Sequence, residues 1–227
     1  TRVVNVDRDQ FGDRFFSGFE PSSFSCLADE ALSKKLIEKE LQKLEKIFLE
    51  TKYLVTGTNL LSSPISAETI FFLIELANQF EVKIIIDLNW REVFWDYSSF
   101  SSEISKTERV NLIKEFLNHA DVLKLAKEEA TLFFGHENPS LISQQISKRP
   151  DVIITDGENP ITWYIKGIQG FNETPKSQDV VDTTGAGDAF LAGLISKFIS
   201  TGYPSNELDI KDCIQFASVC GLLTCLG

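Results

Sequence analysis

The stretch that decides the fold is Asp182-Thr183-Thr184-Gly185-Ala186-Gly187-Asp188. An extended segment precedes it, and an apolar run of helical character over residues 189–198 follows it. A strand end, a glycine-rich turn and a helix start in this order bring unpaired backbone N–H groups together, and the helix dipole adds partial positive charge there. The stretch therefore predicts a turn that binds an anion.

Two features of this turn indicate phosphoryl transfer. Gly185 and Gly187 let the backbone approach a ligand closely, because neither carries a Cβ atom. Asp188 places a carboxylate in the first helical turn, beside the predicted anion site. Backbone amides that stabilise phosphoryl oxygens, next to a base for a hydroxyl proton, suit the transfer of a phosphoryl group to an alcohol.

Three other interpretations of the turn compete with this one. A dinucleotide-binding fingerprint, G-x-G-x-x-G, needs a third glycine where Phe190 stands. A Walker A loop needs a lysine after the glycines, and none follows. The plainest alternative is a glycine-rich turn in which Asp188 is an ordinary first-turn acid. The complete stretch, between a strand and a helix, favours the functional interpretation.

Extended by Ala-Phe, the stretch resembles D-T-T-G-A-G-D-A-F, the C-terminal signature of the ribokinase/PfkB carbohydrate kinases. The resemblance implies an α/β fold, a ribokinase-like three-layer α/β/α sandwich with a mainly parallel sheet and with the lid largely missing. It also implies that Asp188 is the base, and that Gly185, Ala186 and Gly187 form the anion hole.

A second motif lies at residues 82–91, an apolar strand that ends in D-x-N-x-R and resembles a segment of the sugar-kinase branches of the family. By this resemblance, Asn89 and Arg91 bind the sugar or the transferring phosphate, and Trp95 closes the motif. Arginine suits this task because its planar fork of donors matches a phosphate. An ion pair between Asp87 and Arg91 at the strand end remained the alternative.

Three residues resemble the nucleotide-binding positions of the family. Thr155 and Gly157 match a V-T-x-G segment that lies along the nucleotide phosphates, although Pro160 replaces its second glycine. Ser218 stands in an F-A-N-A-x-G stretch beside the adenine, in place of the asparagine. The resemblance therefore implies ATP binding by Thr155, Gly157 and Ser218.

The resemblance also implies metal ions. Residues 121–129 resemble a strand followed by N-x-x-E, with Ala126 in place of the asparagine and Glu129 linked through water to Mg²⁺. A solvated acid in a first helical turn was the alternative for Glu129. Asp182 and the carbonyl of Thr184 match a monovalent-cation loop, and the use of K⁺ was left open.

The pattern of the whole chain agrees with an α/β fold. Helical periodicity over residues 30–49, 66–80 and 107–119 alternates with short apolar strands, which favours a parallel sheet covered by helices. Ser66 is the predicted N-cap of the second of these helices, and residues 167–178 are predicted to be a polar loop. The first helix is expected to bury Leu32, Leu36, Leu41, Leu44 and Phe48.

We expect one partial kinase domain over residues 1–227, in which residues 1–19 are a remnant of the lid hairpin and residues 20–227 form the α/β nucleotide-binding core. The chain is expected to be incomplete at both ends. A homodimer of the full-length protein, paired through its lid, was left open because relatives of this kind pair in that way.

Composition narrows the partners and the compartment. The formal net charge of −11 argues against nucleic acid and anionic membranes as partners. Cysteine spacing gives no zinc motif, and three cysteines in one apolar helix fit a reducing compartment. We therefore expect a cytoplasmic protein, with an organelle-targeting segment left open.

These observations predict an ATP- and Mg²⁺-dependent kinase that phosphorylates a hydroxyl of a sugar or sugar acid. Fructose and 2-keto-3-deoxygluconate are the first candidate substrates by resemblance, and a nucleoside was kept as a further candidate. The alternatives are a non-catalytic family member that binds a nucleotide or a sugar in a regulatory or structural role, and an NAD-binding redox enzyme.

Overall fold

The computed structural model describes residues 3–8, 14–20, 31–92, 95 and 105–226. The chain divides into two compact units. The first consists of residues 1–84 and 89–119, and the second of residues 85–88 and 120–227. The second unit carries the signature turn, which we define as residues 182–188.

The main sheet has six strands in the order β3-β4-β5-β6-β7-β8. Strand β5 pairs in parallel with β4 and with β6, whereas β7 pairs antiparallel with β6 and with β8. The predicted α/β fold with a mainly parallel sheet is confirmed. The strands are β3 (Tyr53–Gly57), β4 (Lys83–Asp87), β5 (Val122–Ala126), β6 (Asp151–Asp156), β7 (Asn159–Ile165) and β8 (Ile168–Asn172).

A separate antiparallel hairpin is formed by β1 (Val3–Arg8) and β2 (Arg14–Glu20). The hairpin expected within residues 1–19 is therefore present. Its role as a lid stays a prediction.

The first helical segment differs from the prediction. Residues 30–49 were expected to form one helix, but the described part has α1 (Lys34–Lys39) and α2 (Leu41–Glu50), separated at Glu40, whose φ of −109° and ψ of 16° leave the helical range. Leu32 and Leu36 are 53% and 44% exposed instead of buried, while Ile37 and Phe48 are buried.

The other helices of the first unit are α3 (Pro64–Gln79) and α5 (Lys106–Leu117), with the short 3₁₀ helix η2 (Thr58–Ser62) before α3. Helix α3 begins two residues earlier than predicted, with Ser63 at the N-cap instead of Ser66, because Pro64 takes the first helical position without losing a hydrogen bond. Helix α5 begins with a capping box, in which the Ser105 N–H donates to Glu108 Oε2 at 2.7 Å.

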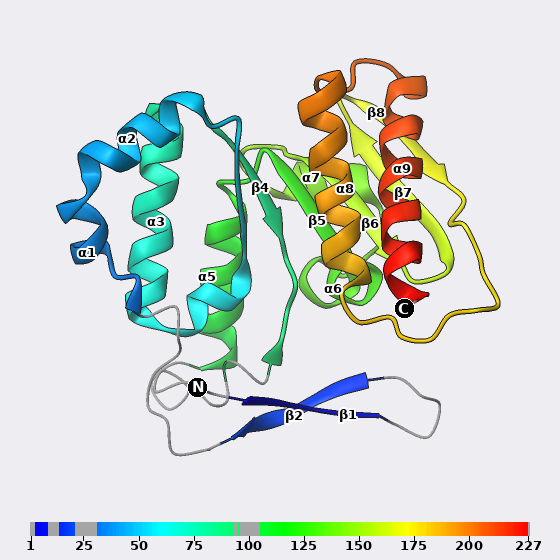
Figure 1. The fold of residues 1–227 in the computed structure, drawn as a ribbon, viewed down its shortest axis with the longest axis horizontal. Coiled ribbons are helices and arrows are strands. Elements are labelled where there is room, and N and C mark those ends of the chain that lie inside the picture. The colour runs from blue at the N-terminus through cyan, green and yellow to red at the C-terminus, as the bar shows by residue number, and fades with distance from the viewer. Residues whose placement is uncertain (1–2, 9–13, 21–30, 93–94, 96–104, 227) are drawn as a thin grey trace. The chain divides into compact units, whose positions relative to one another are not determined.

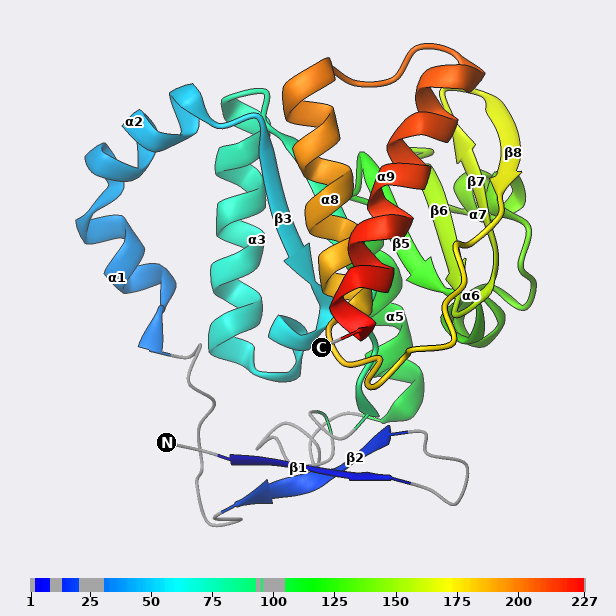
Figure 2. The same ribbon diagram turned by 45° about the vertical axis from the view of Figure 1, so that its right-hand side comes forward.

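The second unit places helices on both faces of its strands. Helices α8 (Ala186–Thr201) and α9 (Glu207–Cys225) lie side by side on one face, and α6 (Lys127–Phe134) and α7 (Pro139–Gln145) lie on the other (Figures 1 and 2). Gly193 lets α8 and α9 approach closely, since a Cβ atom there would lie 2.8 Å from Cys220 Sγ. The three layers surround a core of apolar strand residues.

Strand β8 corrects the prediction of a polar loop over residues 167–178. Lys166 and Gly167 have φ values of 52° and 80°, which make the tight turn that joins β7 to β8. The ring of Trp163 covers Gly170, where a side chain would collide with it. The Trp163 Nε1–H also donates to Asn172 Oδ1 at 2.9 Å, so β8 is secured by a buried indole.

In the part of the chain that the structure describes, there is no helix with both the length and the apolar character needed to span a bilayer.

Candidate active site

The signature turn joins an extended segment to helix α8. Gly185 is the N-cap of α8 and has a φ of 81°, a left-handed conformation that favours glycine. Ala186 and Gly187 are the first two residues of the helix. The Ala186 N–H donates to the Thr183 carbonyl at 3.2 Å, and the Gly187 N–H lies in the first turn, where the helix offers no carbonyl to it. Asp188 follows in the same turn with an exposed side chain. The predicted base and anion hole therefore lie together at one helix N-terminus.

Hydrogen bonds hold the start of this turn. Asp182 Oδ1 accepts the N–H of Thr184 at 2.9 Å, which closes a local loop. The backbone N–H groups of Val181 and Asp182 donate to the carbonyl of Cys225 at 2.8 and 3.2 Å. The end of helix α9 is thereby tied to the start of the turn. Asp182 and Thr184 stay candidates for a cation loop, and the structure gives Asp182 a turn-forming role.

A cavity of about 470 Å³ opens beside the turn, which we name the α8–α9 cavity. Its wall includes Ala186 and Gly187 of the signature turn together with three predicted nucleotide-binding residues, Thr155, Gly157 and Ser218. These residues are far apart in the sequence and come from β6, the β6–β7 turn and α9. Gly185, Asp188 and Pro160 are not part of this wall.

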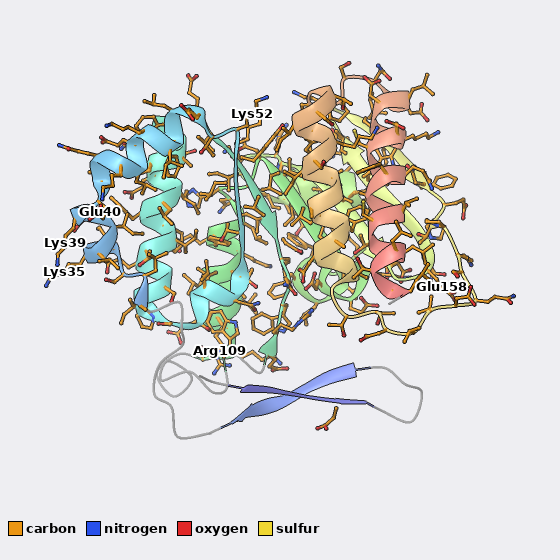
Figure 3. All side chains as sticks on the ribbon, in the orientation of Figure 1. Lys35, Lys39, Glu40, Lys52, Arg109 and Glu158 are labelled. Carbon is orange, nitrogen blue, oxygen red and sulfur yellow. The ribbon has the colours of Figure 1, made fainter. Side chains whose placement is uncertain are left out.

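The wall of the cavity has a polar part and an apolar part. The signature turn and the β6–β7 turn supply backbone amides, and Lys176 adds a positive charge that sequence reasoning missed. Glu158 of the β6–β7 turn also borders the cavity (Figure 3). Apolar side chains cover the rest, namely Ile161, Val180, Phe190, Leu222 and Cys225. An apolar slot that ends in amides and a lysine suits a flat ring joined to a phosphate chain.

Two residues of this wall have local partners. The Ser218 hydroxyl donates to the Ile214 carbonyl at 2.8 Å within α9, and its residue is 4% exposed. Burial raises the pKa of the Cys225 thiol, and the nearby carboxylate of Asp182 raises it further. Both groups therefore present uncharged surface to the cavity.

Glu129 has a structural partner. It is 9% exposed, and its Oε2 accepts the Ala126 N–H at 2.7 Å. This contact is one half of a capping box for α6, and the other half is missing because Ala126 has no side-chain acceptor. The alternative of a solvated first-turn acid is therefore wrong for Glu129. Its link to Mg²⁺ stays a prediction.

Asn89 and Arg91 belong to the first unit, whereas the signature turn belongs to the second. Asn89 has a left-handed backbone with a φ of 42°, which asparagine tolerates better than most residues and which is often found at functional sites. Arg91 Nη1 donates to the Trp90 carbonyl at 3.0 Å. Trp95 is fully buried, and the guanidinium carbon of Arg109 lies 5.9 Å from its ring centre (Figure 3).

A buried ion pair lies next to the signature turn. Lys124 of β5 and Asp87 of β4 face each other in register, and Lys124 Nζ contacts Asp87 Oδ1 and Oδ2 at 3.1 and 3.0 Å. The same nitrogen would lie 3.1 Å from a Cβ atom on Gly187. The sequence suggested an ion pair between Asp87 and Arg91 and gave no sign of Lys124. Only the pairing of the two strands brings this lysine to the site.

The fold and this site define an α/β protein with a glycine-containing turn at the start of a helix, beside a cavity. The model of the pfkB family of carbohydrate kinases matches residues 25–226. The chain therefore belongs to the pfkB family of carbohydrate kinases.

Similar proteins include fructokinases of plants and bacteria. A probable fructokinase-7 of Arabidopsis thaliana is 28% identical over 221 residues, which are 94% of this chain and 58% of that protein. A fructokinase of Salmonella typhimurium is 25% identical over 227 residues, 98% of this chain and 67% of that protein. This chain thus spans between 55% and 67% of the length of such relatives.

Solved structures share the fold. The fructokinase of Xylella fastidiosa with bound ATP superposes with a TM-score of 0.75 at 22% identity, covering 100% of this chain and 68% of that one. A double mutant of the Vibrio cholerae fructokinase, bound to fructose, ADP and a potassium ion, gives a TM-score of 0.65 at 23% identity. It covers 78% of this chain and 55% of that one.

Proposed function

We propose that this chain carries the phosphoryl-transfer site of an ATP-dependent sugar kinase. The observation that supports this most is the α8–α9 cavity, because its wall joins Thr155, Gly157 and Ser218 to the first turn of α8. Adenosine fits the apolar part of the wall, and the phosphate chain then reaches the amides of the signature turn. The fructokinase relatives make a ketose such as fructose the first substrate to test.

In this mechanism, Asp188 takes the proton from a sugar hydroxyl. The resulting oxygen attacks the γ-phosphorus, a new O–P bond forms, and the bond from that phosphorus to the β-phosphate oxygen breaks, so that ADP leaves. The amides of Gly185 and Gly187 donate to the phosphoryl oxygens, where charge is spread in the transition state. The Ala186 amide joins them by exchanging its bond to the Thr183 carbonyl for one to the phosphoryl group. The exposed position of Asp188 beside these amides supports the assignment.

Metal ions enter this proposal with limited roles. Among the residues that the structure describes, no three His, Cys, Asp or Glu side chains gather as a metal site. Mg²⁺ would keep several waters and be held largely by the nucleotide phosphates, whose charge it would neutralise. Glu129 would then act from outside through water. A monovalent cation at Asp182 and Thr184 is tested by comparing K⁺ with tetramethylammonium.

The test is sugar-dependent release of ADP from Mg-ATP, measured with ketoses, aldoses, sugar acids and nucleosides. We expect turnover with one class of sugar and a fall of about 100-fold to 10,000-fold in kcat for Asp188→Asn. Asp212→Asn is the matched control, because Asp212 is an exposed acid of α9 that is paired with Lys197 and lies outside the cavity wall.

A second candidate function is a non-catalytic nucleotide binder. The structural partners of Glu129 and Ser218 favour it, since both residues serve their own helices. ATP binding without turnover on any acceptor would support this candidate and contradict the kinase proposal. Equal activity of Asp188→Asn and the original chain would contradict the assigned base.

A further inference from the structure

The ion pair between Lys124 and Asp87 lies outside the residues to which the proposed mechanism gives a role. Lys124 is 7% exposed and Asp87 is 6% exposed, so both charges are removed from water. Burying an ammonium and a carboxylate costs several kcal/mol per ion before their attraction is counted, and apolar side chains of similar size are often at least as stable. Stability alone therefore does not explain a buried ion pair at this position.

The geometry points to a direct role for Lys124 in phosphoryl transfer: its ammonium donates a hydrogen bond to an oxygen of the phosphoryl group bound at the signature turn, and Asp87 holds it in place. This inference rests on the proposed function, which supplies the phosphoryl group. Lys124 would then complete the anion hole from the strand side.

The position of the ammonium is the first argument. Lys124 Nζ would lie 3.1 Å from a Cβ atom on Gly187, which is one of the cavity-lining residues of the first turn of α8. The lysine thus reaches the same helix N-terminus that is expected to hold the anion. Gly187 is needed there, because any side chain would press against the ammonium.

The number of donors is the second argument. A lysine ammonium has three N–H donors and no acceptor. Within the described ranges, the acceptors of Lys124 Nζ are the two carboxylate oxygens of Asp87, at 3.1 and 3.0 Å. Two donors are thereby used and one remains. A phosphoryl oxygen at the neighbouring turn would satisfy the third donor.

The charge is the third argument. Asp87 balances the ammonium and binds it from one side, which fixes the direction of its remaining donor. The pair needs no rearrangement when negative charge grows on the phosphoryl oxygens, and preorganised donors of this kind are worth most in a site shielded from water. Removal of one such donor typically lowers kcat about 100-fold to 1000-fold.

The test uses two variants and two measurements. Lys124→Met removes the charge and keeps the length of the side chain, but it also removes the ammonium that balances the buried Asp87 carboxylate. The double variant Asp87→Leu, Lys124→Met removes both charges and is expected to fold, because apolar pairs commonly replace buried ion pairs. Lys148→Met is the matched control, since Lys148 pairs with Asp121 at 2.9 Å at the other end of β5.

The first measurement separates kcat from KM. We expect kcat to fall about 100-fold or more in both variants, with KM for ATP and for the sugar changed by less than about threefold. The second measurement compares the Kd of ADP alone with the Kd of ADP plus Mg²⁺ and aluminium fluoride, which imitates the transferring group. We expect the variants to keep the affinity for ADP alone and to lose the affinity for ADP with Mg²⁺ and aluminium fluoride.

The outcomes distinguish this inference from the proposed function. Suppose that the original chain phosphorylates a sugar and that both variants fold and keep its kcat. If they also bind ADP with Mg²⁺ and aluminium fluoride more tightly than ADP alone, as the original chain does, Lys124 only joins two strands and the inference is wrong. If no sugar is phosphorylated, the kinase proposal fails, yet a preference for ADP with aluminium fluoride that disappears in the variants still supports the lysine as a phosphate donor.

Discussion

The contact between helices α8 and α9 gives a quantitative prediction for Gly193→Ala. A Cβ atom at this position would lie 2.8 Å from Cys220 Sγ, 3.0 Å from Cys220 Cβ and 3.2 Å from Ala217 Cα. The sulfur can turn away, but the other two atoms move only with the backbone of α9. The helices must therefore separate by some tenths of an ångström.

Two opposing terms set the size of the effect. Overpacking of a tight interior typically costs about 1–3 kcal/mol, whereas alanine stabilises a helix by about 1 kcal/mol relative to glycine. Because two of the three close contacts cannot be relieved by a rotamer change, we take about 2 kcal/mol for the steric cost. The expected net loss in the free energy of unfolding is then about 1 kcal/mol.

The assay is urea unfolding followed by far-ultraviolet circular dichroism. Ala192→Gly is the matched control, because Ala192 is the exposed neighbour on the same helix and reports the helix-propensity term alone, about 1 kcal/mol of destabilisation. Cys220→Ala combined with Gly193→Ala should recover part of the loss. If Gly193→Ala raises stability by as much as Ala192→Gly lowers it, the two helices are not in tight contact and the reasoning fails.

Three further predictions concern residues of the site. Ala126→Asn should complete the capping box that Glu129 half forms and raise the free energy of unfolding by about 1 kcal/mol in the same urea assay, while Ala126→Val, which has no acceptor, should bring no gain. Gly187→Ala should displace the Lys124 ammonium and lower kcat in the ADP-release assay, and unchanged turnover would contradict the close approach of the two residues. Because the pKa of the Cys225 thiol is raised, iodoacetamide at pH 8 should modify this thiol more slowly than a free cysteine. The modification rate should increase as the pH rises and decrease when ATP is bound. Mass spectrometry of the labelled peptide measures the rate under each condition.

Local patterns in the sequence were sufficient for the signature turn. Two glycines and an acid before an apolar run specify backbone geometry within a few residues, and Gly185 has the left-handed conformation that such a turn requires. The strand end predicted just before the turn is wrong, because residues 173–181 form no strand. The same locality explains the correct placement of most strands. Strands β4 and β6 each have a buried apolar run bounded by polar residues, and burial on both faces needs no information from elsewhere in the chain.

Other features depend on contacts that a linear pattern does not contain. The break at Glu40 divides a continuous helical periodicity, and its sequence has neither proline nor glycine to announce it. Strand β8 contains Gly170 and polar residues, and it exists because the Trp163 ring covers it and Asn172 binds the indole. At β8 a tertiary contact overrides local propensity.

The site itself shows why its electrostatics escaped sequence reasoning. Asp87 and Lys124 are 37 residues apart in the sequence. Each lies in a mainly apolar strand, and nothing in the pattern of either strand alone pairs the two charges. Parallel pairing of β4 with β5 places them opposite each other, one at the last residue of its strand and the other two residues before the end. Parallel strands end at the same edge of a sheet, and ligands of open α/β sheets bind at that edge. A charged side chain just inside the edge therefore lies below the ligand and is shielded from solvent. Oppositely charged side chains within paired strands near this edge are therefore better candidates for stabilising the charge of a bound ligand than exposed acids beyond the strand ends. Lys124 lies within such a strand and is buried, whereas Glu128 lies beyond the strand and is exposed.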